Sequence, residues 1–531
     1  MTVTLAPDFT TIAERVRHHA RLAPQRPALL QGDRRLDYAG LDARMDRVAA
    51  ALQHEGRGPG DTIAICAGMS IEHVCVFLGA LRAGLAVAPL APGAGAASLA
   101  RMVDDAQACC VFVDAVGTQA MGPALPTAPP RIAIDGSNGA RAFDAWLGDA
   151  DQPPRAVEIR PEWPFNIIYS SGTTGEPKGI VQSHGMRWSH VCRGATYGYG
   201  PDTVTLLSTP LYSNTTLVVF FPTIACGGAV VLMPKFDAQA YLELAQRHRA
   251  THTMLVPVQY QRLMALPEFG RFDLSSFHMK FSTSAPFGAA LKADVLERWP
   301  GGLVEFYGMT EGGGTCILEA HKHPHKLHTV GPAAQGHDIR LIDDHGVEVA
   351  PGQAGEVVGH SGGMMTGYHR QPEKTREAEW FDPSGKRFIR TGDIGRFDAD
   401  GFLILFDRKK DMVISGGFNV YPSDLEAVLH QHPAVADVAV VGVPSDRWGE
   451  TPVAFVVLRA DAPAVPAADL LQWTNAQLGK TQRLGDLQVC SELPRSAIGK
   501  VLKRELRAAY GDAAAMAGTS AAARSPASTG T

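Results

Sequence analysis

Short apolar runs alternate with segments of helical periodicity through the N-terminal half of the chain. A run at 63–66 precedes one such segment, and a second run follows at 85–90. The helical positions between them are Ile71, Val74, Cys75, Leu78 and Leu81. The alternation returns as a predicted helix at 242–249 and a predicted strand at 253–256. Because strands that alternate with helices form mostly parallel, two-sided sheets, we expect an α/β fold with layered sheets in a large N-terminal domain.

The pattern changes near residue 339. Short β-prone runs at 339–342, 355–359 and 402–406 are separated by turn-forming sequences. This pattern predicts a small antiparallel, β-barrel-like subdomain at about 330–406.

A third pattern begins after Asp411. Ser423 and Glu426 have the spacing of a capping box at the start of a helix, and strands are expected at 435–443 and 453–458. We therefore predict a large domain at 1–407 and a mobile α+β domain at 412–510. The final residues, 511–531, are small and polar without periodicity, which is typical of a disordered tail.

Composition narrows the functional classes. The 531 residues are 45% hydrophobic and 19% charged, as in ordinary globular proteins of two or more domains. A net charge of -5 offers no basic field for nucleic acid. The eight cysteines form no CxxC pair, so we expect reduced, mostly buried thiols. Without a signal-like start or an apolar run of membrane-spanning length, we expect a cytoplasmic enzyme.

The segment from Tyr169 to Gly179 reads YSSGTTGEPKG and follows an apolar, strand-like run. Its glycines allow close approach of the backbone, and its hydroxyls, amides and lysine are donors to phosphate oxygens. It is not a Walker A loop, because Pro177 precedes Lys178 and the glycine spacing differs. We interpret the segment as a triphosphate-binding loop, and the alternative is a solvated Gly/Ser turn.

With this loop, and with further motifs in the same order, the chain resembles the adenylate-forming superfamily of acyl- and aryl-CoA synthetases, luciferases and peptide-synthetase adenylation domains. The resemblance extends from Leu36 to Lys500. It implies that the enzyme uses ATP and Mg²⁺, with coenzyme A as a substrate. It also implies ATP contacts from the loop at Ser170, Ser171, Gly172, Thr173, Thr174, Gly175 and Lys178, with Thr174 a weaker Mg²⁺ candidate.

The resemblance implies further nucleotide contacts. In YGMTE, Tyr307 stacks on adenine beside Gly308, Thr310 contacts phosphate and acts in catalysis, and Glu311 holds Mg²⁺. A divalent cation is needed because an acidic protein cannot otherwise bind three phosphates. The other implied ATP-binding residues are Ser284, Ala285 and Pro286, in the segment that lines the adenine and acyl pockets, and Asp393 and Arg408 for the ribose.

By the same resemblance, Lys500 in PRSAIGK is the catalytic lysine that bridges the carboxylate and the α-phosphate. The hinge corresponds to 408–411, with Lys410 as the pivot between the two half-reactions. Gly416 and Gly417 match the backbone that meets the pantetheine arm of coenzyme A, although a glycine pair is also an ordinary turn.

The acyl pocket is expected around Tyr212, Ser213, Asn214, Gly312 and Gly313. Ser213 stands where the family usually has histidine, so specificity can differ here. The run Gly312 to Gly314 either widens the pocket for a bulky acid or forms a flexible loop. The histidine-rich segment at 321–328 is more typical of a solvated loop than of a metal site, since Pro324 breaks any helical face.

The sequence therefore predicts an AMP-forming acid–thiol ligase that makes an acyl-adenylate and then an acyl-CoA thioester. The alternative is an enzyme that loads the acyl group onto a carrier protein's phosphopantetheine. Two further alternatives are a luciferase-like oxygenase and a non-catalytic nucleotide-binding protein, and the last is disfavoured because Lys500 and Glu311 are present. The expected partner is a small carboxylic acid, aromatic, alicyclic or medium-chain, and the sequence leaves open a homodimer.

Overall fold

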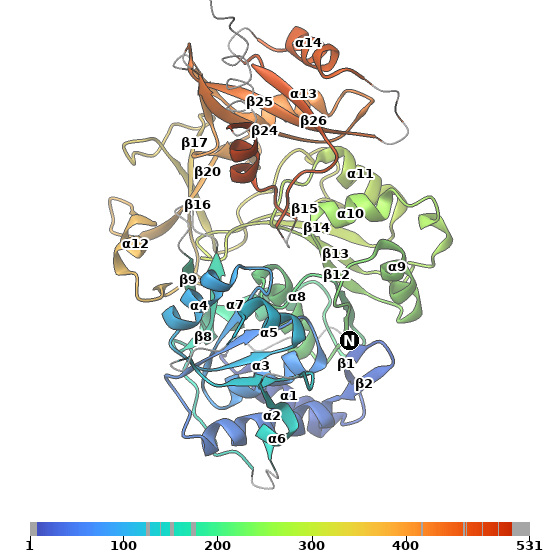
Figure 1. Cartoon of the computed structure of the whole chain (residues 1–531), viewed down its shortest axis with the longest axis vertical. Helices are drawn as coiled ribbons and strands as arrows, with labels where there is room; N and C mark the ends of the chain where they lie inside the picture. Colours follow the sequence, from blue (N-terminus) through green and yellow to red (C-terminus); the bar gives the residue numbers. More distant parts are fainter. Residues whose placement is uncertain are drawn as a thin grey trace, which may run out of the picture. The chain divides into compact units, whose positions relative to one another are not determined.

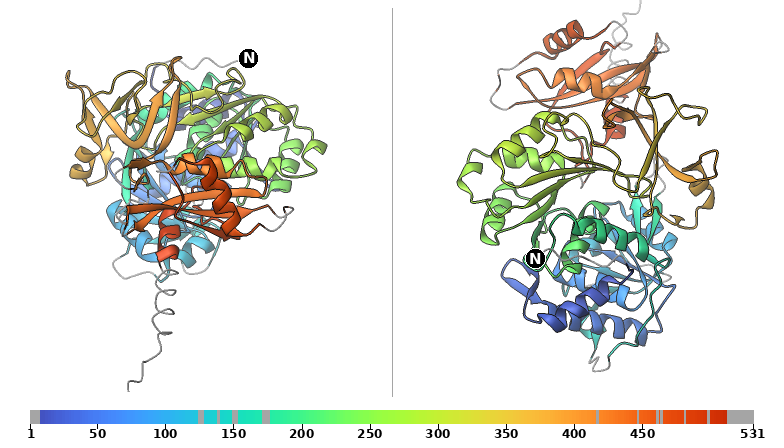
Figure 2. Two further views of the ribbon diagram at one scale, coloured as in Figure 1. Left: turned by 90° about the horizontal axis from the view of Figure 1, so that it is seen from above. Right: turned by 180° about the vertical axis from the view of Figure 1, so that it is seen from behind.

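The computed structural model describes residues 8–123, 128–137, 140–148, 153–170, 177–415, 418–445, 447–459, 462, 465–479, 482–496 and 499–511 (Figures 1 and 2). Backbone contacts divide the chain into two units. The first comprises 1–340, 358–391 and 398–403, and the second comprises 341–357, 392–397 and 404–531. The boundary that we predict at residue 407 and the tail beyond 511 stay predictions.

The first unit contains two eight-stranded sheets (Figure 1). One has the order β18 (Gly367–Tyr368), β9 (Lys178–Ser183), β8 (Pro164–Ser170), β4 (Ala86–Leu90), β3 (Thr62–Cys66), β5 (Ala108–Val113), β6 (Arg131–Ala133) and β7 (Arg141–Ala142). The other has the order β15 (Cys316–Glu319), β14 (Gly302–Tyr307), β13 (Met279–Ser282), β12 (His252–Leu255), β10 (Val204–Leu207), β11 (Ala229–Leu232), β1 (Pro27–Gln31) and β2 (Arg34–Asp37).

Helices connect these strands. They are α1 (Ile12–Leu22), α2 (Tyr38–His54), α3 (Ile71–Arg82), α4 (Ala96–Asp105), α5 (Ala115–Met121), α6 (Phe143–Leu147), α7 (His184–Ala195), α8 (Asn214–Ala225), α9 (Ala238–Arg247), α10 (Pro257–Met264), the 3-10 turn η1 (Phe269–Arg271), α11 (Ala289–Arg298) and α12 (Pro372–Glu377). No helix within the described ranges is long and apolar enough to cross a bilayer.

The predicted strand–helix–strand unit at 63–90 is confirmed as β3, α3 and β4, with Ser70 capping the helix. β3 and β4 are parallel, as the alternation requires. The second predicted helix is α9, which begins at Ala238 rather than 242 because the Asp237 carboxylate accepts from the Ala240 amide and caps it there.

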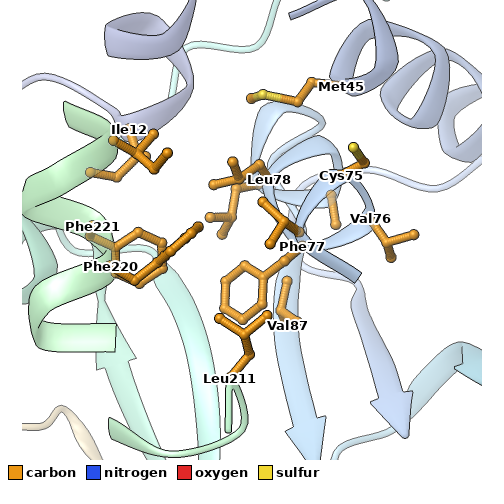
Figure 3. Close-up of a cluster of buried hydrophobic side chains, with 14 of the residues drawn as sticks. Ile12, Met45, Cys75, Val76, Phe77, Leu78, Val87, Leu211, Phe220 and Phe221 are labelled. Atoms are coloured by element: carbon orange, nitrogen blue, oxygen red, sulfur yellow. The ribbon is translucent and has the colours of Figure 1, made fainter. Parts of the chain in front are cut away.

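The main core of the first unit packs helix against helix and against both sheets. Phe77 of α3 lies beside Phe221 of α8, with ring centres 5.8 Å apart, and Phe165 of β8 completes the cluster at 5.0 Å from Phe221. Figure 3 shows Phe77 and Phe221 with Leu78 and Leu211, which are also buried. These contacts hold α3 and α8 against β8.

The predicted barrel-like subdomain is instead an open sheet. Its order is β16 (Asp338–Ile342), β17 (Gly355–His360), β20 (Arg387–Phe397) and β19 (Glu379–Phe381), with β21 (Leu403–Arg408) also beside β20. Among the described strands the first and last members do not pair, so the sheet does not close. The short strands and turns were predicted correctly, but strand periodicity carries no information on closure.

The second unit carries another five-stranded sheet, ordered β23 (Phe418–Val420), β22 (Val413–Ser415), β25 (Gly449–Leu458) and β24 (Val435–Ser445), with β26 (Asp486–Cys490) beside β25. Its helices are α13 (Pro422–Leu429) and α14 (Ala467–Gln477). The predicted strands at 435–443 and 453–458 are confirmed.

The predicted capping box is wrong. Helix α13 begins at Pro422, two residues before the start that a Ser423 cap would give, because proline suits the first helical position, where a missing N–H costs nothing. The Ser423 amide donates to the Asp407 carboxylate at 2.6 Å, and the Glu426 carboxylate accepts from the Val440 amide at 2.8 Å.

The eight cysteines are free thiols, and Cys66, Cys75, Cys110, Cys226 and Cys316 are buried, as expected.

Candidate active site

A cavity of about 900 Å³ lies within the first unit. Its walls come from α7, α8, strands β13 to β15 and the segments 332–337 and 361–363. The predicted site residues that line it are Asn214, Ser284, Gly308, Thr310 and Gly312. Those of the same unit that do not line it are Ser170, Lys178, Tyr212, Ser213, Ala285, Pro286, Tyr307, Glu311 and Gly313. The cavity thus joins residues expected for the nucleotide and for the acyl group.

The cavity lies where parallel strands end. Ser284 follows β13, Gly308 follows β14, and Asn214 follows β10 after a short connection. These strands belong to one run of parallel pairs, so their carboxyl ends share an edge of the sheet. Such an edge is the usual ligand-binding position of α/β sheets.

Lys178, Tyr368 and Glu311 form a chain of contacts beside this cavity. The Lys178 ammonium lies 5.0 Å from the centre of the Tyr368 ring, a cation–π distance. The Tyr368 hydroxyl donates to the Glu311 carboxylate at 2.9 Å. Burial, and then the charge of Glu311, raise the pKa of Tyr368, which keeps the hydroxyl a donor. The antiparallel pairing of β18 with β9 brings these distant residues together.

A buried arginine fixes the wall formed by α7. Arg187 donates to the side-chain oxygens of Asn166 at 3.0 Å and Asn214 at 2.7 Å, and it also contacts Gln182. The Gln182 amide donates to the Thr310 carbonyl at 2.7 Å. Burial lowers the pKa of Arg187 to about 9, so the network holds a costly buried cation. Asn214 and Thr310 are therefore positioned by one hydrogen-bonded unit.

Ser284 and the start of α8 are also linked. Ser284 adopts a left-handed backbone with φ +80°, and its hydroxyl lies 2.6 Å from the Thr215 hydroxyl. Thr215 is in the first turn of α8, where buried Ser213 is the N-cap and accepts from the Thr215 amide at 3.3 Å. Ser213, the departure from the family's histidine, is thus a helix cap.

The glycine run packs closely against neighbouring strands. A Cβ at Gly312, where φ is +73°, would lie 2.1 Å from the Gly363 carbonyl oxygen. A Cβ at Gly313 would lie 2.9 Å from another backbone oxygen, and one at Gly314 would lie 1.9 Å from Ile339 Cδ1. Close packing therefore requires glycine at all three positions. Of the three, only Gly312 lines the cavity, so the run as a whole does not widen it.

In the second unit, Asp393 and Arg408 form an ion pair at 3.2 Å, on the paired strands β20 and β21. The Lys500 ammonium lies near enough to both side chains for their charges to shift its pKa. Although the Lys500 residue is exposed, partial desolvation of its ammonium, and then the positive charges of Arg408 and Lys410, lower its pKa to about 8. The predicted ribose pair, pivot and catalytic lysine therefore share one neighbourhood within this unit.

Several predicted residues lie outside the described ranges: Ser171, Gly172, Thr173, Thr174, Gly175, Gly416 and Gly417. Ser170 and Lys178, which are members of the predicted phosphate loop, are paired directly across the ends of β8 and β9. In the histidine-rich segment, His321 contacts the Leu303 carbonyl at 3.0 Å and His323 packs on Phe402. Within the described residues, no group of three or more His, Cys, Asp or Glu side chains is arranged to hold a metal.

Comparison with known proteins decides the family. The model for AMP-binding enzymes matches residues 16–369, and the model for their C-terminal domain matches residues 424–500. The chain belongs to the AMP-binding enzyme family. Its motifs and its relatives place it with the adenylate-forming superfamily, of the acyl- and aryl-CoA synthetase type.

Relatives of this AMP-binding enzyme match over nearly their full length. Feruloyl-CoA synthase of Amycolatopsis sp is 32% identical over 505 residues, covering 93% of this chain and 97% of the relative. Indoleacetate–CoA ligase of Aromatoleum aromaticum is 32% identical over 514 residues, with the same coverage. The crystal structure of the anthranilate CoA ligase AuaEII with anthranoyl-AMP superposes with a TM-score of 0.84 at 25% identity, covering 96% of this chain and 99% of that one.

The structure also brings residues to the site that our reading of the sequence missed. Tyr368 lies in a two-residue strand, and Arg187 lies in the first turn of helix α7, where a surface position is the usual expectation for an arginine. The only local signal for Arg187 is its neighbourhood of buried Met186 and Trp188. Tyr368 has no local signal, because its partners lie far away in the sequence.

Proposed function

We propose that this AMP-binding enzyme is an ATP-dependent carboxylic acid:CoA ligase that acts through an acyl-adenylate. The observation that carries the proposal is the Lys178–Tyr368–Glu311 chain beside a 900 Å³ cavity. A lysine for phosphate and a carboxylate for a cation, next to space for an organic acid, are what adenylate formation needs. The relatives named as CoA ligases support the same chemistry.

Mg²⁺ fits Glu311. One oxygen of its carboxylate accepts from Tyr368, and the hydrogen bonds of the described residues leave the other oxygen available. Mg²⁺ usually binds proteins through one or two carboxylates, with water and substrate phosphates completing its shell, so a dedicated cluster is not needed. When bound, the cation would supply charge neutralisation at the phosphates. Thr174 stays a weaker candidate ligand.

In the first half-reaction, a carboxylate oxygen of the acid attacks the α-phosphorus of ATP, and the bond to pyrophosphate breaks. We assign Lys178 and the loop from Ser170 to the phosphates, with Thr310 beside them. Lys500 is assigned to the α-phosphate and the attacking carboxylate, where an ammonium reduces the repulsion between two anions. Tyr307, Gly308, Ser284, Ala285 and Pro286 are assigned to the adenine, and Asp393 and Arg408 to the ribose.

In the second half-reaction, the thiol of coenzyme A attacks the adenylate carbonyl and AMP leaves, with the thiol proton lost to solvent. The ordinary thiol pKa of about 8.5 makes the thiolate accessible near neutrality. We assign Lys410 as the pivot between the two steps, and Gly416 and Gly417 as the backbone beside the pantetheine arm.

The acid is proposed to be aromatic. Tyr197 and Phe306, whose rings are 6.0 Å apart at 75°, line the cavity and offer surfaces for an aromatic ring. Among the predicted acyl-pocket residues, Asn214 and Gly312 contribute to that wall, while Tyr212, Ser213 and Gly313 do not line the cavity. Feruloyl and indoleacetate relatives agree with this class.

The test is a panel of aromatic, alicyclic and medium-chain acids with ATP and Mg²⁺, following pyrophosphate and AMP with and without coenzyme A. We expect acid-dependent pyrophosphate release, and a CoA-dependent thioester. Pyrophosphate release that yields a thioester only with a phosphopantetheinylated carrier protein would favour the carrier-loading alternative. We also propose a cytoplasmic location, and a sizing column tests the homodimer.

A further inference from the structure

The cavity is lined by an arginine that pairs with no carboxylate of the described residues. Arg193 lies in the last turn of α7, half-buried in the cavity wall. Among the described residues its guanidinium has no carboxylate partner; its side-chain hydrogen-bond contact is the ring of His337, at 3.5 Å from Nη1 to Nε2, and the neutral phenol of Tyr197 lies near enough to interact with its charge. Burial lowers the pKa of Arg193, so a cation at this position of the wall is unfavourable unless an anion lies next to it.

In the contact between Arg193 and His337, a hydrogen-bond donor faces another donor. The Thr315 amide donates to His337 Nδ1 at 3.0 Å, so that nitrogen carries no proton. Burial, and then the charges of Arg193 and His360, lower the pKa of His337 to about 4, so the ring is neutral near pH 7. Its single proton is therefore on Nε2, which faces Nη1–H of Arg193. Neither group satisfies the other.

No carboxylate among the described lining residues pairs with Arg193. The one carboxylate among these described residues is Glu319, which pairs with Lys322 at 2.8 Å. His190 also lines the cavity, and burial keeps its pKa well below the ordinary value, so it is neutral. The described residues that line the cavity thus carry a net charge of +1, because Glu319 and Lys322 cancel and Arg193 remains.

We propose that the acid substrate carries a second acidic group, a carboxylate, which binds between Arg193 Nη1 and His337 Nε2. This inference rests on the proposed function and names its substrate class: a dicarboxylic acid, of which one carboxylate is adenylated and the other is held by the donor pair. A carboxylate suits the pair because its two oxygens accept from both donors at once, and because its charge cancels that of the arginine.

The test compares acids that share a skeleton. The first series is cinnamate, 4-carboxycinnamate and 4-carbamoylcinnamate, and the second is hexanoate, adipate and adipate monoamide. The readout is kcat/KM for acid-dependent pyrophosphate release at saturating MgATP. In at least one series we expect the diacid to exceed its amide by about 30-fold or more, because hydrogen bonds to charged groups contribute factors of about 10 to 100. This comparison uses the unmodified protein, so it does not depend on the folding of a variant.

Arg193→Met locates the effect. We expect it to lower kcat/KM for the preferred diacid by about 30-fold or more, and to change that of the monoacid by less than about threefold. The matched control is Arg247→Met, since Arg247 is an exposed arginine near the end of α9, and it should change neither value.

Three outcomes would overturn the inference. Amides used as well as diacids would show that no second anion is recognised. Equal losses for monoacid and diacid in Arg193→Met would place the guanidinium at the reacting carboxylate or the nucleotide. Both of these leave the proposed function intact, because acids are still activated. No pyrophosphate release with any acid would remove the proposed function and this inference together.

Discussion

The variant Tyr368→Phe tests whether the Tyr368 hydroxyl orients the Glu311 carboxylate. The change removes the hydrogen bond to Glu311 but keeps the ring under the Lys178 ammonium. It therefore isolates one interaction, the orientation of the carboxylate that we assign to Mg²⁺.

The expected size follows from the geometry. A hydrogen bond at 2.9 Å to a carboxylate contributes about 1.5 to 3 kcal/mol, and loss of a group that orients a metal ligand usually costs about 10- to 100-fold in affinity. Glu311 is only half-buried, so water can replace the hydroxyl as donor and what is lost is orientation. We therefore predict the lower end of the range, about a tenfold rise in the Mg²⁺ concentration for half-maximal activity.

The assay is acid-dependent pyrophosphate release as a function of free Mg²⁺ at fixed ATP. The matched control is Tyr241→Phe, which removes a buried hydroxyl that donates to Thr253 at 2.6 Å, away from the cavity lining. The control should lower thermal stability without changing the Mg²⁺ dependence. If Tyr368→Phe leaves that dependence within about twofold of the original while Glu311→Gln abolishes activity, the orienting role is wrong.

Further predictions concern the two units separately. Lys292→Met should cost about 3 to 5 kcal/mol in urea unfolding, because it leaves Glu305 charged and buried without its ion-pair partner. Since burial raises the pKa of Glu305, this loss of stability should shrink as the pH falls and the carboxyl protonates. The double variant Lys292→Met with Glu305→Leu should recover most of the lost stability. A loss of stability that stays the same at low pH would contradict this explanation. Lys500→Ala should lower adenylation at least about a hundredfold while leaving thioester formation from synthetic adenylate; equal losses in both steps would make Lys500 structural. Because the pKa of Lys500 is about 8, the ammonium is present below that pH, and kcat/KM for adenylation should fall as the pH rises through it; a flat profile to pH 9.5 or so would argue against the role. Lys410→Pro should slow the second half-reaction more than the first by fixing φ at the pivot, and equal rates would remove Lys410 from that role.

Local elements were predictable because their causes are local. The β3–α3–β4 unit follows from apolar spacing, and the Asp393–Arg408 ion pair joins two motifs that the family resemblance already singled out. The capping box at Ser423 failed for an equally local reason, since Pro422 is a stronger start signal than a serine one residue later.

Long-range pairing was not predictable from one sequence. The strand that carries Tyr368 lies nearly two hundred residues after its partner strand β9, and no periodicity links the two. The same holds for Arg193 and His337, which meet only through the fold. Open and closed sheets also have the same strand pattern, so the barrel-like expectation could not be refined until the strand order was known.

The most direct test of the account is acid-dependent exchange of labelled pyrophosphate into ATP by the purified protein, in the absence of coenzyme A. The account predicts exchange that needs both Mg²⁺ and a carboxylic acid and that is lost in Glu311→Gln. No exchange with any acid in a broad panel, from a protein shown to be folded and to bind ATP, would contradict it.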